Sequence, residues 1–176
     1  YAGTRVGRLL ELSDGGGSVL WRLIDIYIRE TKKFLAPISP HPFIVLVDND
    51  SGGASVNSAL KRHNAPFPPS ASYVPVQKNL YAMRTPPIAG KTDTAIEDFF
   101  DDATKKVKLN GKSFSCAKNA DPDHFYGKKA FAHSVVRPNA KTIDFSAFEP
   151  LLSTIVAIQM HYAKIAAPIA PVSTVP

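Results

Sequence analysis

The sequence is poor in the features that mark several protein classes. It holds one cysteine, Cys116, which excludes an intrachain disulfide and favours a reducing, cytosolic compartment. With this one thiol and scattered histidines, we expect no zinc site. Every uninterrupted apolar run is far shorter than the roughly 20 residues that a membrane span needs. We therefore expect no membrane partner, and we find no internal repeat.

The residues that are abundant are those of a folded domain. Hydrophobic side chains make up 44% of the 176 residues, enough for one domain with a sizeable core. The chain starts at Tyr1, and we expect it to be a piece of a longer protein. We predict one domain over residues 1–165 and a flexible tail over 166–176, where prolines stop the last helix.

The net charge of +6 is unevenly distributed. Residues 93–102 hold five acids and no Lys or Arg, whereas residues 105–141 hold nine basic residues and two acids. An acidic centre beside a basic flank suits a nucleic acid held next to metal-binding carboxylates, and a solvated basic surface is the alternative. The candidate phosphate-backbone contacts are Lys105, Lys106, Lys108, Lys112 and Lys129.

Helical and strand patterns alternate along the chain. The predicted helices cover 19–34, 54–63, 125–136 and 144–166, and a short helical turn is predicted over 94–100. Ser18 is the predicted N-cap of the first helix, and Asp93 or Thr94 that of the short turn. The predicted strands cover 6–12, 43–47 and one or two stretches within 72–87, and a hairpin turns at Asn110-Gly111. This order predicts an α/β domain with a mainly parallel sheet flanked by helices and a helical C-terminal part.

Two aspartates follow the apolar strand in the stretch "FIVLVDNDSGG". In parallel α/β sheets, ligands bind beyond the carboxyl ends of the strands. Asp48 and Asp50 repel each other when close, and Mg²⁺, which prefers oxygen ligands, relieves that repulsion. Gly52 and Gly53 allow a tight turn or the close approach of a phosphate. The alternative is that Asp48 caps the next helix and Asp50 is a turn residue.

Several enzyme families place a D-x-D after an apolar strand. Haloacid-dehalogenase-type phosphatases do so, but they usually continue with Gly-Thr, where this chain has Ser51-Gly52. Glycosyltransferases that bind a nucleotide sugar through a metal also do so, as do the Toprim domains of topoisomerases, primases and nucleases.

The order of the remaining motifs favours the Toprim family. "LYAMRTP", "IEDFF", "LNGKSF", "YGKKAFAHSVV" and "IDFSAFEPLLSTIVAIQMHY" follow the D-x-D stretch in turn. Together they resemble the C-terminal region of retron-type reverse transcriptases, in which a Toprim-like domain follows the polymerase. The resemblance extends from about Gly15 to Tyr162. The chain is also similar to the Toprim part of overcoming-lysogenisation-defect nucleases.

This resemblance implies roles for individual residues. Asp48 and Asp50 match the D-x-D that binds Mg²⁺ or Mn²⁺. Glu97 matches an acidic position that completes or braces the metal site, with Asp98 as its alternative. Lys128 matches a Gly-Lys element near the active site and would act as a point charge on the scissile phosphate.

One element of the Toprim pattern is missing. The family has a glutamate on its first strand, in an apolar–Glu-Gly context, which acts as a general base or acid or as a metal ligand. Glu11 lacks that context, and we expect the motif upstream of Tyr1. The site in this chain would then be incomplete, and the isolated chain would be inactive.

The resemblance implies a metal-dependent nuclease. As part of a retron-like protein in the bacterial cytoplasm, it would be a toxic effector in antiphage defence. The reverse transcriptase domain and its RNA–DNA product would be its partners and restrain it. The alternative, from another class, is a non-catalytic module that docks nucleic acid or the polymerase.

Other conspicuous residues are interpreted as structural. Trp21, Phe99 and Phe100 are expected in the core rather than as platforms for stacked bases. His124 and His133 are expected to be packing or surface residues rather than metal ligands or bases.

Overall fold

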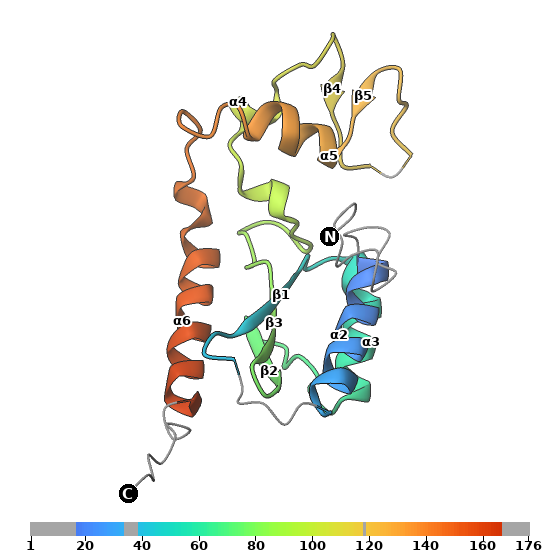
Figure 1. Ribbon diagram of the computed structural model, residues 1–176. Coiled ribbons are helices and arrows are strands. Elements are labelled where there is room, and N and C mark those ends of the chain that lie inside the picture. The colour runs from blue at the N-terminus through green and yellow to red at the C-terminus, as the bar shows by residue number, and fades with distance from the viewer. Residues whose placement is uncertain (1–16, 34–38, 118, 167–176) are drawn as a thin grey trace, which may run out of the picture. The chain divides into compact units, whose positions relative to one another are not determined.

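The computed structural model describes residues 17–33, 39–117 and 119–166 (Figure 1). The chain divides into two compact units. Unit 1 comprises Tyr1–Thr94 and Pro150–Pro176, and unit 2 comprises Ala95–Glu149. Helices and small sheets occur together, so the predicted α/β class is confirmed at that level. The predicted strand over 6–12 and the predicted tail beyond Ala166 lie outside the described residues.

Unit 1 is built on a three-stranded sheet in the order β1-β3-β2. Its strands are β1 (Phe43–Val47), β2 (Tyr73–Gln77) and β3 (Leu80–Arg84). Strands β1 and β3 are parallel, whereas β2 and β3 are antiparallel. The predicted parallel pairing therefore holds for the pair that carries the aspartates, while the third strand runs the other way.

Helices α2 (Gly17–Thr31) and α3 (Ala54–Arg62) cover one face of this sheet (Figure 1). Their apolar residues recur at helical spacing and meet the alternate residues of β1 and β3 that point to the same side. These contacts exclude water from one continuous core. Its buried members are Ile24, Ile28, Val45, Val47, Val56, Leu60, Leu80 and Ala82.

Helix α6 (Glu149–Ala166) covers the opposite face of the sheet (Figure 1). The ring of Tyr81, on β3, is fully buried, and its hydroxyl lies 2.7 Å from Nδ1 of His161. Tyr162 also packs edge-on against Tyr81 and donates a hydrogen bond of 2.5 Å to the carbonyl of Ser39. Burial raises the pKa of the Tyr81 hydroxyl, so it stays a neutral hydrogen-bonding group.

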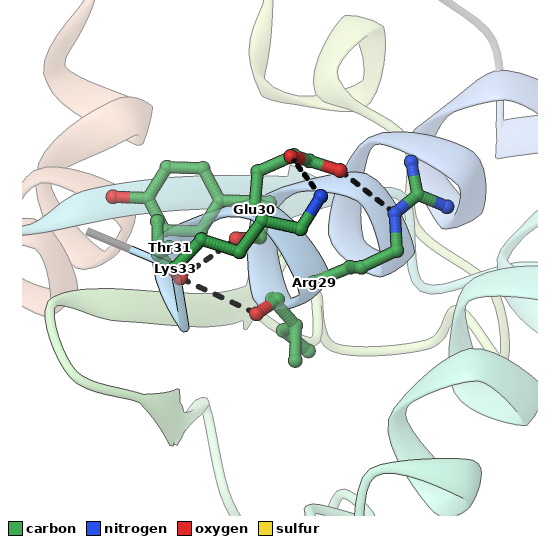
Figure 2. A network of polar contacts seen from close by, with 6 residues as sticks. Arg29, Glu30, Thr31 and Lys33 are labelled. Atoms are coloured by element: carbon green, nitrogen blue, oxygen red, sulfur yellow. Dashed lines mark hydrogen bonds and ion pairs between the residues drawn. The ribbon is translucent and has the colours of Figure 1, made fainter.

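The C-terminal end of α2 carries a small polar network (Figure 2). Glu30 accepts hydrogen bonds from Lys33 Nζ and Arg29 Nε, each at 2.8 Å. These two cations lower the pKa of the Glu30 carboxyl, Lys33 more than Arg29. Thr31 Oγ1 donates to the carbonyl of Tyr27 at 2.7 Å. The two ion pairs of Glu30 are exposed, so they add little to the stability of the fold.

Unit 2 is held together by aromatic side chains. Phe100, Tyr126, Phe131 and Val135 form its buried cluster, which confirms the core position predicted for Phe100. Its elements are η2 (Ile96–Phe99), α4 (Asp102–Lys105), β4 (Ser113–Phe114), β5 (Phe125–Tyr126), α5 (Lys128–Ala130), a π-helical turn η3 (Phe131–Val136) and η4 (Ser146–Phe148).

The predicted hairpin exists only as a turn. Asn110 and Gly111 both have positive φ, 50° and 79°, and Leu109 and Lys112 exchange two backbone hydrogen bonds around them. The ladder ends there because β4 pairs in parallel with β5 instead. The helix predicted over 125–136 begins at Lys128 for the same reason, since its first residues form β5.

Two predicted helix starts also differ. The N-cap predicted at Asp93 or Thr94 falls on Ala95, whose backbone N–H donates to Oδ2 of Asp98, inside the turn, at 2.8 Å. Helix α2 begins at Gly17, so Ser18 lies inside it. Across the described ranges, no helix combines the length and apolar character that crossing a membrane requires.

Candidate metal and phosphate site

The two aspartates lie at the carboxyl edge of the parallel strand pair. Val47, the last residue of β1, is the register partner of Arg84, the last residue of β3. Asp48 and Asp50 follow β1 directly, and a short 3₁₀ turn, η1 (Ser51–Gly53), then leads into α3. This is the edge at which open α/β sheets bind ligands.

Hydrogen bonds to Asn49, between the two aspartates, hold the backbone there. Asn49 N lies 2.9 Å from Thr85 Oγ1 and 2.8 Å from the carbonyl of Thr94, and its own carbonyl accepts from Thr94 N at 3.0 Å. Thr85 Oγ1 in turn donates to the carbonyl of Thr94 at 2.7 Å, while Thr85 N donates to the carbonyl of Val47. Both threonines are 1% exposed, so these bonds are shielded from water.

Asp50 has a structural role as well. Its Oδ1 accepts from the backbone N–H groups of Gly52, at 2.8 Å, and Gly53, at 3.2 Å, and so caps the turn that precedes α3. The alternative stated from the sequence makes Asp48 the cap and Asp50 a turn residue. The structure gives the cap to Asp50. The bonds fix the orientation of its carboxylate and engage one of its two oxygens.

Gly53 is required by close packing. A Cβ at this position would lie 2.9 Å from the carbonyl oxygen of Asp48 and 3.2 Å from Cγ1 of Val47. Only glycine lets α3 start this close to the end of β1. A Cβ at Gly52 would instead meet the flexible carboxylate of Asp50, at 3.0 Å from Oδ1.

The residues present are compatible with a hard divalent cation. Mg²⁺ is usually bound by one or two carboxylates, and water and substrate phosphates complete its coordination. Asp48 is partly buried, and the cap formed by Asp50 through Oδ1 leaves Oδ2 of that carboxylate for another ligand. Within the described ranges, no three His, Cys, Asp or Glu side chains are grouped as metal ligands. An ion held here would therefore depend on ligands beyond the two aspartates.

Glu97 and Lys128, both predicted as site residues, form an ion pair in unit 2. Glu97 Oε2 lies 2.8 Å from Lys128 Nζ, and the two side chains are 10% and 43% exposed. The same oxygen is buried and accepts no hydrogen bond of regular geometry from the described residues. The ion pair is therefore its main compensation for lost hydration. Asp98, the alternative to Glu97, accepts a hydrogen bond from the backbone N–H of Ala95, the N-cap residue of η2.

The predicted nucleic-acid contacts differ in their surroundings. Lys105 lies 3.4 Å from Asp102, and Lys112 donates to the carbonyl of Pro122 at 2.6 Å. Lys106, Lys108 and Lys129 are exposed and make no ion pair within the described residues. Lys129 also lines a shallow hollow together with Gly127, Ala130 and His133.

The structure also places the residues that were interpreted as structural. Phe99 is buried, and Trp21 packs against the core of unit 1, as predicted. His133 is exposed, and His124 is an exposed partner of Asp121 at 2.6 Å. Glu11, the weaker candidate for the missing glutamate, lies outside the described residues.

Sequence reasoning missed Thr85 and Thr94. The signal is weak, since each threonine lies in a segment rich in proline or charge, and 36 residues separate Thr85 from Asn49. The pattern that would suggest such a bond is a threonine directly after an apolar strand, because its hydroxyl can bond to the backbone that follows the neighbouring strand.

Comparisons with known proteins leave the family open. No protein-family model matches this chain, and no solved structure matches its fold.

The hydrogen bonds of Thr85 predict a measurable cost when they are removed. Thr85→Val keeps the shape of the side chain but loses one donor and one acceptor, so we expect a loss of about 1 to 3 kcal/mol in the free energy of unfolding. Urea unfolding would measure it. Thr92→Val, at an exposed position in the same unit, is the matched control. Equal stabilities of the two variants would contradict the role assigned to Thr85.

The Glu97–Lys128 pair predicts an asymmetric response. Lys128→Met strands a buried carboxylate, so we expect a loss of about 1 to 3 kcal/mol in the free energy of unfolding, whereas Glu97→Gln removes one partner of a half-exposed lysine and should cost less. The double variant should regain part of the loss, because the stranded charge is gone. Chemical unfolding of each variant tests this, with Lys129→Met as the exposed neighbour. Similar effects of Lys128→Met and Lys129→Met would rule out a buried pair of consequence.

Proposed function

We propose that this chain is a metal-dependent phosphodiesterase domain that cleaves nucleic acid, as the Toprim-like part of a retron-type reverse transcriptase. One observation carries the proposal. Two carboxylates flank a residue whose backbone is fixed on both sides, at the carboxyl edge of a parallel strand pair. Preorganised carboxylates at such an edge are what a metal-assisted phosphoryl reaction requires.

The roles of the chain's own residues follow from their contacts. Asp48 and Asp50 would hold Mg²⁺ or Mn²⁺, and Thr85 holds the backbone of Asn49, the residue between them. A bound divalent ion supplies an acidified water and neutralises charge on the phosphate. Lys128 would contribute a cation for a phosphate oxygen, and Glu97 holds that cation in place.

The setting proposed for this activity is antiphage defence. The domain would act as a toxic effector in the bacterial cytoplasm, restrained by the reverse transcriptase domain and its RNA–DNA product. This part of the proposal depends on the order of sequence motifs, whereas the metal chemistry has support from the local geometry.

The test is cleavage by the complete protein that carries this chain. We expect single-stranded DNA, double-stranded DNA or RNA to be cut in Mg²⁺ or Mn²⁺ and not in EDTA. Asp48→Asn and Asp50→Asn should each reduce the rate about a hundredfold or more. Asn is the suitable replacement at position 50 because its amide oxygen still caps η1, whereas Ala would also remove the cap.

The control for this test is Asp93→Asn, which removes one exposed charge from unit 1. We expect it to leave cleavage unchanged. Cleavage at the wild-type rate by both Asp48→Asn and Asp50→Asn would end the catalytic assignment.

A second candidate function is a non-catalytic module that docks nucleic acid or the polymerase. It is favoured by the exposed cations Lys106, Lys108 and Lys129, which no described acid neutralises. Binding through such residues is dominated by phosphate contacts and falls steeply with salt.

Charge reversal tests this second candidate. We expect Lys106→Glu combined with Lys108→Glu to weaken binding of a labelled oligonucleotide in EDTA about tenfold or more, because two phosphate contacts become repulsive. Lys61→Glu, at an exposed position of α3, is the control. Fluorescence anisotropy at several salt concentrations gives the affinities. Equal affinity of the double variant and the control would contradict nucleic-acid docking through Lys106 and Lys108.

A further inference from the structure

Arg84 is the last residue of β3 and lies at the same sheet edge as the two aspartates. Its register partner is Val47, which immediately precedes Asp48. Because side chains alternate along a strand, Arg84 is on the face that carries Leu80 and Ala82, the face covered by α2 and α3. The core ends at this position, and a cation takes the place of the next apolar residue.

The guanidinium of Arg84 is supported by an aromatic ring. Its Cζ lies 4.1 Å from the ring centroid of Phe67, in the loop between α3 and β2. Phe67 itself packs against the core of unit 1. The backbone N–H of Arg84 donates to the carbonyl of Ser72 in the same loop, at 3.0 Å. The side chain is partly buried, and this desolvation lowers its pKa, although the group remains charged.

In the part of the chain that the structure describes, no acid compensates the charge of Arg84. Among the described residues, no Asp or Glu lies within ion-pair distance of Arg84. Arg62 provides the contrast within the same unit. It also lies near a ring, at 5.8 Å from Trp21, but its guanidinium is 2.9 Å from Oδ2 of Asp25. A desolvated cation without an anion is unfavourable, and a cation–π contact compensates only part of that cost.

We propose that Arg84 is a phosphate-binding residue, which takes a phosphate group of a nucleic acid at the carboxyl edge of β1 and β3, beside Asp48 and Asp50. Its planar guanidinium can donate two parallel hydrogen bonds to phosphate oxygens, a geometry that lysine lacks. A ring beneath the guanidinium limits its rotamers, so less conformational entropy is lost when the anion binds. The phosphate would also supply oxygens toward an ion on the aspartates.

This inference rests on the proposed function for the identity of the polymer, but phosphate binding needs neither the metal nor cleavage. The experiment therefore measures binding in EDTA. The full chain is titrated against a fluorescein-labelled 15-nucleotide oligo(dT), with inorganic phosphate as competitor, at several salt concentrations.

We expect Arg84→Gln to weaken binding about tenfold and to reduce the slope of log affinity against log salt by about 0.7, the loss of one phosphate contact to a single strand. Arg84→Lys keeps the charge and the aliphatic stem, and should bind with an affinity between those of the wild type and Arg84→Gln. It also keeps the proposal testable should Arg84→Gln fold poorly. Arg62→Gln removes an equal charge and should bind within about twofold of the wild type, because Asp25 already neutralises that cation.

The outcomes separate this inference from the nuclease assignment. Wild-type affinity and salt slope in both Arg84 variants would overturn it, as would an equal loss in Arg62→Gln or no binding by the wild type. If binding depends on Arg84 but the complete protein cleaves nothing, the phosphate site stands and the nuclease assignment falls. If the protein cleaves and the Arg84 variants bind normally, the reverse holds.

Discussion

The buried hydrogen bonds between Thr85, Asn49 and Thr94 are the constraint on which the candidate site depends. They join Asn49, just after β1, to Thr85, just after β3, and to Thr94, the last residue of the first segment of unit 1. The backbone between the two aspartates is thereby paired on both its N–H and its carbonyl side. A flexible D-x-D loop would lose conformational entropy each time it bound an ion. Here the backbone of Asn49 is already ordered in the folded protein, so less entropy is lost on binding.

The residues that connect β1 to α3 include both candidate metal-binding carboxylates. Gly53 allows α3 to start against the carbonyl of Asp48, and Asp50 caps the turn with Oδ1. Capping and metal binding are compatible because they use different oxygens of one carboxylate. The cap also aligns the negative charge with the positive end of the helix, which offsets part of the repulsion from Asp48. The local fold thus tolerates two neighbouring acids without an ion, and an ion would add to that stability.

Local pattern predicts much of this structure, while contacts distant in sequence do not follow from it. The run Phe43–Val47, the helical spacing around Ile24 and Ile28, and the Asn110-Gly111 turn each identify their element because a few neighbouring residues decide it. The β4–β5 pairing, the Thr85 bonds and the Glu97–Lys128 contact depend on residues more than ten positions apart. Asp50 illustrates the intermediate case, since the motif marks it as chemically important but does not reveal that it is also the cap.

The distribution of compensated and uncompensated cations narrows where an anion can bind. Arg62 lies within ion-pair distance of Asp25, and Arg29 and Lys33 share Glu30, so each of these cations already has an acid beside it within the protein. A phosphate that approached them would compete with a carboxylate already in place. Arg84 has an aromatic ring where the others have an acid, and it lies at the edge where β1 releases its two aspartates. A ring holds a cation without cancelling its charge, so the field of Arg84 remains available to a ligand. That difference, more than the number of basic residues in the chain, supports the proposed anion site at Arg84.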